Sequence, residues 1–174
     1  MAQEFRFKLV LFGNVAVGKT SIIDRYVNDK FENEYISTLG YNVFEKIVKV
    51  GTSGTSVSFM IFDIGGQEQF EELRKKYAAG AKAALLVYDV TNRESFDNIS
   101  KWHNDLEKFT DNAHYVLVGN KIDLKTKRQV NTNEGANLAK KVNASGFFET
   151  SAKTNEGINH VFNKLAEILI KKST

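Results

Sequence analysis

The feature that constrains this chain most is the stretch GNVAVGKT, residues 13–20, which separates an apolar run from a segment with helical periodicity. The spacing Gly13-x4-Gly18-Lys19-Thr20 is that of a phosphate-binding loop, which needs a strand before it and a helix after it. The glycines let backbone N–H groups turn toward a phosphate, and the helix N-terminus adds its positive end. Lys19 would reach the β- and γ-phosphates, and the Thr20 hydroxyl would bind Mg²⁺. The motif predicts a nucleotide without identifying the base; the alternative is a glycine-rich turn before an ordinary helix.

Apolar residues alternate along the chain between short runs and segments with helical spacing. Short runs rich in β-branched and aromatic residues predict strands at 5–12, 43–50, 57–62, 83–88, 115–118 and 146–149. Apolar residues three and four apart predict helices at 19–27, 95–109, 133–142 and 158–170. The letters GTSG between the second and third of these strands are typical of a hairpin turn. The alternation predicts an α/β fold, a mostly parallel sheet with helices on both faces and one antiparallel edge strand.

The composition fits one folded domain over residues 1–174, with 42% hydrophobic residues and no cysteine. The sequence therefore offers no disulfide or cysteine-based metal site, which fits a reducing cytosolic interior. No apolar run approaches the length of a membrane span, and the charged N-terminus is not typical of a signal peptide. The net charge of +3 is small and the basic residues are scattered, which predicts a solvated surface and no nucleic-acid partner; the alternative is a weak preference for acidic surfaces.

The second motif, DIGGQE, stands at the end of the hairpin's second strand. Asp63 at the end of that strand could hold Mg²⁺ through water. Gly66 offers a backbone N–H that no side chain blocks, which suits contact with a γ-phosphate. Gln67 is neutral, and it could place a water in line with that phosphate. A turn with an exposed polar cluster is an equally good interpretation of this motif alone.

The third and fourth motifs, GNKID and TSAK, follow two later strands. The Asp123 carboxylate could accept both N1–H and N2–H₂ of guanine, whereas adenine offers a lone pair and a C–H there. A buried carboxylate without partners is costly, so the motif also disfavours an ATP-dependent kinase or ATPase. Asn120 belongs to the same motif, and the Lys121 stem could lie along the base and ribose. In the fourth motif a backbone N–H near Ala152 could donate to guanine O6, although such a string also occurs by chance at helix starts.

Four motifs in this order, each at the carboxyl end of a predicted strand, predict a guanine nucleotide with Mg²⁺. The sequence resembles the Ras superfamily of small GTPases over essentially its whole length, on the stretches GNVAVGKTS, DIGGQEQF, LLVYDVTNRESFDNISKW, VGNKIDL and ETSAKT. The stretch VYDVTNRESF, the tryptophan and Thr38-Leu39-Gly40 look most like the Rab branch. The resemblance implies a P-loop NTPase fold with five helices around a six-stranded sheet. It also implies a monomeric switch that binds GTP and GDP, hydrolyses GTP slowly, and meets effectors, exchange factors and GTPase-activating proteins in vesicle trafficking or signalling.

The resemblance also assigns roles to individual positions. Gln67, Lys19 and Thr38 would be catalytic, and Thr20, Thr38 and, through water, Asp63 would hold the metal. Phe31 would stack its edge against guanine, with a core position as the alternative, and the alternative for Thr38 is an exposed strand start. The full set expected to bind nucleotide is Gly13, Val15, Ala16, Val17, Gly18, Lys19, Thr20, Ser21, Phe31, Tyr35, Thr38, Gly66, Asn120, Lys121, Asp123, Ser151, Ala152 and Lys153.

Several positions depart from the Rab pattern, in the two expected switch loops near 31–44 and 63–78. The letters LGYNVF replace the usual Ile-Gly-Val-Asp-Phe after the switch threonine, and Phe62 replaces a tryptophan. Val43, Phe62 and Tyr77 would still form an apolar effector patch. Its binding partners cannot be inferred from those of Rab proteins. Gly65 resembles the Gly-Gly-Gln of Arf-like and heterotrimeric Gα proteins, and an extra glycine should loosen the second switch loop.

Val15 occupies the position of a Ras glycine next to the γ-phosphate and the catalytic glutamine. We expect its bulk to leave nucleotide binding intact and to slow hydrolysis; the alternative is that Val15 packs under the loop. A GTP-binding interaction module with little hydrolysis is therefore a second candidate function. No arginine lies between Lys30 and Thr38, so a transition-state arginine would come from a partner. The chain as given has no cysteine for a lipid. Either a lipid-bearing tail lies beyond the given residues, or membrane association is expected through partners or not at all.

Overall fold

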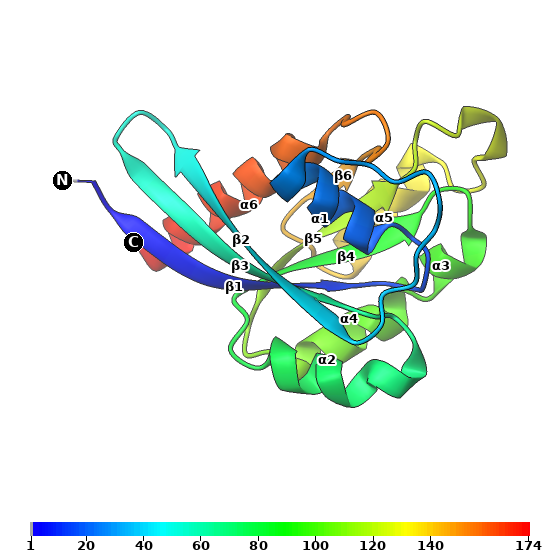
Figure 1. The fold of residues 1–174 in the computed structure, drawn as a ribbon, viewed down its shortest axis with the longest axis horizontal. Helices are drawn as coiled ribbons and strands as arrows, with labels where there is room; N and C mark the ends of the chain where they lie inside the picture. Colours follow the sequence, from blue (N-terminus) through cyan, green and yellow to red (C-terminus); the bar gives the residue numbers. More distant parts are fainter. Residues whose placement is uncertain (1) are drawn as a thin grey trace.

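One mixed β-sheet organises the computed structural model, which describes residues 2–174 (Figure 1). Met1 of the expected domain 1–174 lies outside the described residues. Among these residues six strands form the sheet, in the spatial order β2-β3-β1-β4-β5-β6. Their bounds are β1 (Glu4–Phe12), β2 (Tyr41–Val50), β3 (Thr55–Ile64), β4 (Ala83–Asp89), β5 (His114–Asn120) and β6 (Phe147–Glu149). Each predicted strand is present, with ends shifted by a few residues.

The strand directions confirm the predicted hairpin. β2 pairs with β3 in the antiparallel sense, with Val43 opposite Phe62 and Val50 opposite Thr55. The other pairs, β1 with β3 and β4, β4 with β5, and β5 with β6, are parallel. The connecting turn places Gly51 and Gly54 at φ of 65° and 79°, where a side chain would be strained. β2 is therefore an antiparallel edge strand on an otherwise parallel sheet.

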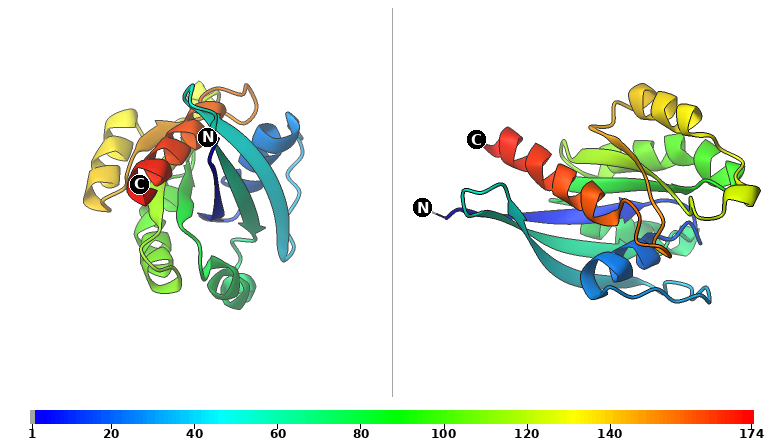
Figure 2. Two further views of the ribbon diagram at one scale, coloured as in Figure 1. Left: turned by 90° about the vertical axis from the view of Figure 1, so that its left-hand side faces the viewer. Right: turned by 90° about the horizontal axis from the view of Figure 1, so that it is seen from above.

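Helices cover both faces of the sheet (Figures 1 and 2). The bounds in the described part of the chain are α1 (Lys19–Asn28), α2 (Glu71–Ala78), α3 (Arg93–Asp97), α4 (Ile99–Phe109), α5 (Thr132–Lys141) and α6 (Ile158–Ser173), with short 3₁₀ turns η1 (Glu68–Phe70) and η2 (Lys125–Lys127). The helix expected at 95–109 starts earlier and is interrupted at Asn98, so α3 and α4 together correspond to one of the five expected helices. α1 and α6 pack on one face, and α2, α4 and α5 pack on the other.

The core follows from the two-residue period of the strands. Leu9 and Leu11 of β1 join the cluster under α1 and α6, whereas Val10 and Phe12 join the cluster on the opposite face. All seven residues of β4 are buried because this strand lies between parallel neighbours with helices on both sides. The sheet is thus a rigid base whose strands β1, β3, β4, β5 and β6 end at the same edge.

The helix α2 was not predicted from the sequence. Its letters EELRKKYA contain few apolar residues, and its buried side carries Arg74 and Ala78 instead of an apolar stripe. The stretch expected as a switch loop near 63–78 is therefore the end of a strand, a short loop, the turn η1 and a helix. In residues 2–174 no helix is both long and apolar enough to span a membrane.

Candidate functional site

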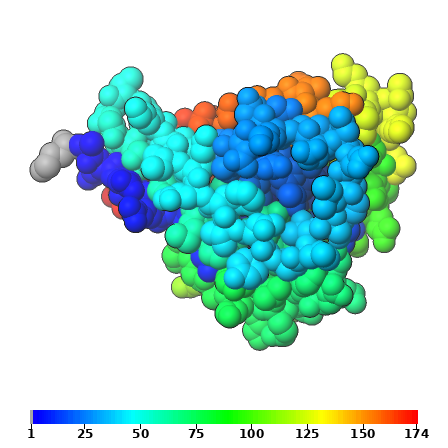
Figure 3. All heavy atoms as spheres, viewed as in Figure 1, coloured from blue at the N-terminus to red at the C-terminus, as the bar shows by residue number. Residues whose placement is uncertain are grey.

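A cavity of about 480 Å³ opens at the carboxyl ends of the strands. The segment between α1 and β2, residues 29–40, forms one wall and runs over the near face in Figures 1 and 3. The predicted site residues in its lining are Val15, Ala16, Gly18, Lys19, Thr20, Ser21, Phe31, Tyr35, Thr38, Gly66, Gln67, Asn120, Lys121, Asp123, Ala152 and Lys153. One cavity thus collects residues from all four motifs. Gly13, Val17, Asp63 and Ser151 are not in the lining.

The phosphate loop surrounds the buried ammonium of Lys19. Its Nζ donates hydrogen bonds to the carbonyl oxygens of Gly13 at 2.7 Å and of Asn14 at 2.8 Å. Burial lowers the pKa of Lys19 to about 8; the Asp63 carboxylate opposes this change and the Arg74 cation adds to it. A buried cation next to the N-terminus of α1 is a place where a phosphate is favourable.

The two glycines of the loop have different tasks. Gly18 has φ of 99° and a Cβ there would lie 2.3 Å from the Asn120 amide nitrogen, so only glycine fits. A Cβ on Gly13 would lie 2.3 Å from the Val87 carbonyl oxygen. Gly13 therefore allows the loop to pack on β4, beneath the cavity, and Val17 is likewise buried.

Three predicted metal ligands converge between the loop and β3. The Thr20 hydroxyl donates to Asp63 Oδ2 at 2.6 Å, and its oxygen is 2.6 Å from the Thr38 hydroxyl oxygen. Asp63 is fully buried, and burial raises its pKa against the Thr20 hydrogen bond and the Lys19 charge. Its second oxygen, Oδ1, has no hydrogen-bond partner in residues 2–174. Hard oxygen donors around an unpaired carboxylate oxygen fit Mg²⁺, which keeps several waters and takes few protein ligands. In the described part of the chain no group of three or more His, Cys, Asp or Glu residues is arranged to hold a metal ion.

Gln67 and its preceding glycines join the two switch segments. The Gln67 amide nitrogen donates to the Ser37 hydroxyl at 2.9 Å, and its oxygen Oε1 is buried without a partner in the described structure. A Cβ on Gly66 would lie 2.7 Å from the Gly13 carbonyl oxygen, so its backbone lies directly against the phosphate loop. The Gly65 N–H donates to the Gly40 carbonyl at 3.0 Å, and a Cβ there would be 2.7 Å from the Thr38 carbonyl oxygen. Gly65 thus permits close contact between the switches, a role that the sequence did not indicate.

Val15, Phe31 and Tyr35 lie on the wall of the cavity. Val15 is 40% exposed, so it does not pack beneath the loop. Phe31 is partly buried against the core under α1 and α6 while it also lines the cavity, so the two sequence interpretations of it are compatible. Tyr35 is largely exposed at the cavity wall.

The GNKID and TSAK motifs form a closed hydrogen-bonded unit. Asn120 is buried; its amide nitrogen donates to the Val17 carbonyl at 3.1 Å and its oxygen accepts from the Thr150 hydroxyl at 3.0 Å. The Ser151 hydroxyl donates to Asp123 Oδ1 at 2.7 Å. The fully buried Ser151 side chain thus holds the Asp123 carboxylate in place, and the expectation that Ser151 also contacts the nucleotide stays a prediction.

Other supporting residues escaped the sequence analysis. Lys121 Nζ donates to the Ala16 carbonyl at 2.7 Å and pairs with Asp89 Oδ2 at 3.0 Å. Asp89 is the last residue of a buried strand that ends at the same edge of the sheet. This position could have identified Asp89 as a site residue from the sequence alone. Arg25 of α1 donates to the carbonyls of Ala152 and Lys153, both at 2.8 Å. Nothing in the periodicity of α1 indicated this contact.

Comparison with known proteins gives a consistent result. The sequence model described as the Ras family matches residues 8–171. Ras-related protein Rab-3 of Caenorhabditis elegans is 39% identical over 170 residues, which cover 97% of this chain and 76% of that protein. Ras-related protein Rab-3C of Bos taurus is 36% identical over 97% of this chain and 74% of its own length. Ras-related protein Rab-15 of Rattus norvegicus is 36% identical over 95% and 77%. Together with the sheet order and the four converging motifs, these matches show that the chain belongs to the Ras family, as a Rab-like small GTPase.

Proposed function

We propose that residues 1–174 form one G domain, a monomeric switch that binds GTP and GDP with Mg²⁺ and hydrolyses GTP to GDP and phosphate. The observation that carries the proposal is that one cavity is lined by Lys19, Thr20 and Gln67 together with Asp123. A phosphate chain and a base can bind at the same time only where both sets of residues share one space. Without an activating protein we expect slow turnover.

The metal would be held by the groups that converge on β3. The Thr20 and Thr38 hydroxyls would bind Mg²⁺ directly and Asp63 through water, which would satisfy the unpaired Oδ1. When bound, the ion neutralises negative charge on the β- and γ-phosphates. The Thr20 oxygen would bind the ion through a lone pair, so its O–H could still donate to Asp63.

The chain's own groups then act on the γ-phosphate. Lys19 exchanges its two loop carbonyls for phosphate oxygens, with a gain that is large because the ammonium is already out of water. The unpartnered Oε1 of Gln67 can accept a hydrogen bond from the attacking water and so align it. The Gly66 N–H would meet the γ-phosphate, since the Gly66 backbone already lies against the phosphate loop.

Base selection would fall to the closed unit at the other motifs. Asp123 accepts the N1–H and N2–H₂ of guanine, with Ser151 fixing the carboxylate orientation. The backbone N–H of Ala152 donates to guanine O6, and the Lys121 stem covers the base, anchored by the Ala16 carbonyl. Phe31 would contact the base edge from the opposite wall.

Effectors would bind the switch segments and the hairpin. The exposed large apolar side chains there are Tyr35, Ile36, Leu39, Tyr41, Val43, Ile47 and Met60. The rings of Tyr41 and Phe62 pack against the Tyr77 ring of α2, with ring centres 4.2 and 5.4 Å away, so movement of α2 would reshape this surface. Exchange factors, GTPase-activating proteins and any partner-mediated membrane association belong to the same proposal.

A GTP-binding interaction module with little hydrolysis is the second candidate. The observation in its favour is Val15, a branched side chain exposed in the cavity wall beside the phosphate loop. It would compete for the space that Gln67 and the attacking water need. The retained Gln67, with its free Oε1, favours the hydrolytic switch.

Single-turnover hydrolysis of preloaded GTP tests the proposal. Protein with Mg²⁺ should release phosphate slowly, and Gln67→Leu should lower the rate by about tenfold or more because the water loses its positioning group. Gln69→Leu, an exposed glutamine two residues along, is the matched control and should keep the rate. Turnover that is equal in all three proteins would remove Gln67 from the mechanism. No turnover in any of them would favour the interaction module.

A further inference from the structure

Arg74 of α2 is a charged residue in the interior, outside the cavity lining. Its exposed fraction is 2%. Its Nη1 donates to the carbonyl oxygens of Gly65 at 2.9 Å and of Gln67 at 2.7 Å. These two carbonyls lie on either side of Gly66, so one guanidinium holds the segment that carries the proposed catalytic glutamine.

The other side of Arg74 lies on an aromatic ring that contacts the phosphate loop. The guanidinium carbon is 5.0 Å from the centre of the Trp102 ring, a cation–π distance, and Trp102 is also buried. The indole Nε1 donates to Asn14 Oδ1 at 2.7 Å, and the Asn98 amide nitrogen lies 3.3 Å from the same oxygen. Asn14 follows Gly13 in the phosphate loop. A continuous chain of contacts thus runs from Asn14 through Trp102 and Arg74 to Gln67.

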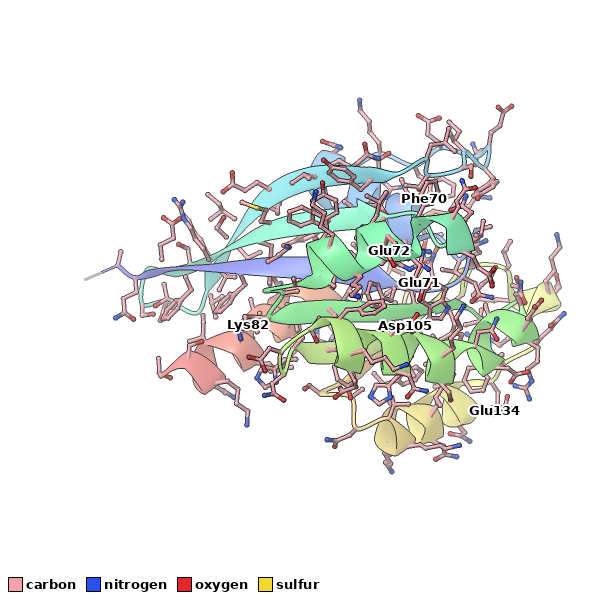
Figure 4. All side chains as sticks on the ribbon, turned by 90° about the horizontal axis from the view of Figure 1, so that it is seen from below. Phe70, Glu71, Glu72, Lys82, Asp105 and Glu134 are labelled. Atoms are coloured by element: carbon pink, nitrogen blue, oxygen red, sulfur yellow. The ribbon has the colours of Figure 1, made fainter. Side chains whose placement is uncertain are left out.

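The charges around Arg74 keep the cation in this position. Figure 4 shows α2 beside α4, with Glu71 labelled on the first and Asp105 on the second. Burial lowers the pKa of Arg74, while the negative charges of Asp105, Glu71 and Glu68 oppose that change. Its Nε has no hydrogen-bond partner within residues 2–174. A buried arginine with one unpaired donor is a costly choice for packing alone, so its contacts with Gly65 and Gln67 call for another role.

We propose that Arg74 and Trp102 are positioning residues that lock the Gly65–Gln67 segment to the phosphate loop and so hold Gln67 in place for hydrolysis. This inference rests on the proposed hydrolytic role of Gln67. Neither residue lines the nucleotide cavity, so neither should contribute directly to nucleotide affinity. If the segment shifts when the γ-phosphate leaves, the Arg74 guanidinium must move relative to the Trp102 ring.

The chain contains one tryptophan, so Trp102 emission reports this contact directly. We would compare the unaltered protein with Arg74→Met, which keeps the chain length without the charge and donors, and with Arg74→Lys, which keeps the charge. Arg93→Met is the matched control, because Arg93 also lies over an aromatic ring, Phe96, at 5.4 Å but far along the chain from both switches. The three readouts are single-turnover GTP hydrolysis, GDP affinity by titration calorimetry, and Trp102 emission with GDP and with a non-hydrolysable GTP analogue.

Arg74→Met should slow hydrolysis by about tenfold or more, because a small misplacement of Gln67 is costly in rate. GDP affinity should stay within about twofold, since the base and phosphate contacts are intact. Arg74→Lys should recover part of the rate. The difference in emission between the two nucleotide states should disappear in Arg74→Met and persist in Arg93→Met.

An unchanged rate in Arg74→Met would overturn the inference, and so would a parallel loss of rate and GDP affinity in both Arg74 variants, which indicates a purely structural residue. If the unaltered protein shows no turnover, the hydrolysis proposal fails by itself and the positioning role for hydrolysis fails with it. The link between the loop and the switch is then decided by emission. The link is supported if Trp102 emission differs between the GDP and GTP-analogue states and this difference is lost in Arg74→Met. It is rejected if emission is the same in both nucleotide states of the unaltered protein.

Discussion

The base-binding side and the switch side of the cavity are built in opposite ways. On the base side, Asn120 and Asp123 already have protein partners, supplied by Val17, Thr150 and Ser151. On the switch side, Asp63 Oδ1 and Gln67 Oε1 are buried without partners among residues 2–174. The proposed base site is therefore held together by contacts within the chain, whereas the switch side contains groups that a metal, a phosphate or a water would complete.

The surrounding structure repeats this contrast. β4 pairs in the parallel sense with β1 and β5, and all seven residues of β4 are buried. On the other side, β2 is an edge strand with mostly exposed residues, and Ile36 and Leu39 before it are 73% and 78% exposed. A segment with few buried apolar contacts and many exposed residues opens at a low cost in free energy. We call the base side, with Asn120 and Asp123, the rigid side, and the switch side, with Asp63 and Gln67, the open side. We infer that recognition of guanine depends on the rigid side, and that switching and hydrolysis depend on the open side.

The largest expected effect comes from breaking the rigid side. Asp123→Asn should lower GDP affinity by about 100-fold, because the amide loses the charge and one of two acceptor positions toward guanine, a cost of about 3 kcal/mol. The control is Asp111→Asn, which changes an exposed carboxylate in the turn after α4 and should leave GDP affinity unchanged. Titration calorimetry measures both. Nearly equal GDP affinity in the two variants would contradict base selection by Asp123.

A methyl group placed on the open side should affect rate more than GDP binding. In Gly66→Ala the new Cβ would lie 2.7 Å from the Gly13 carbonyl oxygen and 3.0 Å from the Val15 nitrogen. The segment must move away from the phosphate loop, so we expect single-turnover hydrolysis to fall by about tenfold or more. The comparison variant is Gly80→Ala, whose Cβ meets nothing within 4 Å although φ is 80°. It should cost some stability through strain and leave hydrolysis unchanged. A normal rate in Gly66→Ala would show that the switch can close without this contact.

The sequence was most informative where local chemistry decides the structure. The alternation of apolar runs predicted the order of strands and helices, and the hairpin turn predicted the antiparallel edge. The phosphate loop could be recognised because Gly18 must adopt a left-handed conformation and Lys19 must follow it, and both are local requirements. The motifs that contain Asp63 and Asp123 could be expected to lie together because residues that follow parallel strands meet at one edge of the sheet.

The sequence was least informative where long-range contacts decide the role of a residue. α2 was missed because a buried arginine stands where the helical pattern needs an apolar residue. The Arg74 contacts with Trp102 and with two carbonyls join segments that no spacing rule connects. The same reason explains Ser151, which lies in a recognisable motif but orients Asp123 instead of lining the cavity. A motif indicates the chemistry near a site. Only the packed structure shows which of its residues line the cavity and which hold other residues in place.

Val15 tests how far the open side is limited by space. Val15→Gly should speed single-turnover hydrolysis by severalfold, roughly 3- to 10-fold, because it frees room beside the phosphate loop for Gln67 and the attacking water. Val15→Ala should fall between the two proteins, which makes the series a graded measure of bulk. GDP affinity should be unchanged across the series, since the base side is untouched. The same rate in all three proteins would mean that Val15 does not restrain hydrolysis.

The smallest expected effect is a loss of folding stability at high pH, caused by three buried tyrosines. Burial raises the pKa of Tyr115 to about 12, and it also raises the pKa of Tyr26 and Tyr88. Tyrosine in the unfolded chain has a pKa of about 10. The stabilisation from these neutral phenols is complete below about pH 10 and is lost as pH rises toward about 12, because the unfolded chain releases protons first. The free energy of unfolding, measured by urea titration at several pH values, should therefore decline over that window.

Tyr115→Phe separates this titration from the hydroxyl's other role. The Tyr115 hydroxyl donates to the Val142 carbonyl and lies 2.8 Å from His103 Nε2, so it bridges β5, α4 and the end of α5. Its removal should cost about 1 kcal/mol at pH 8, typical of one hydrogen bond in a buried site. The decline above pH 10 should become shallower, because one phenol that resists ionisation is gone. A decline of unchanged slope would mean that Tyr26 and Tyr88 carry the alkaline response, and the rigid side would then owe its pH sensitivity to residues nearer the core.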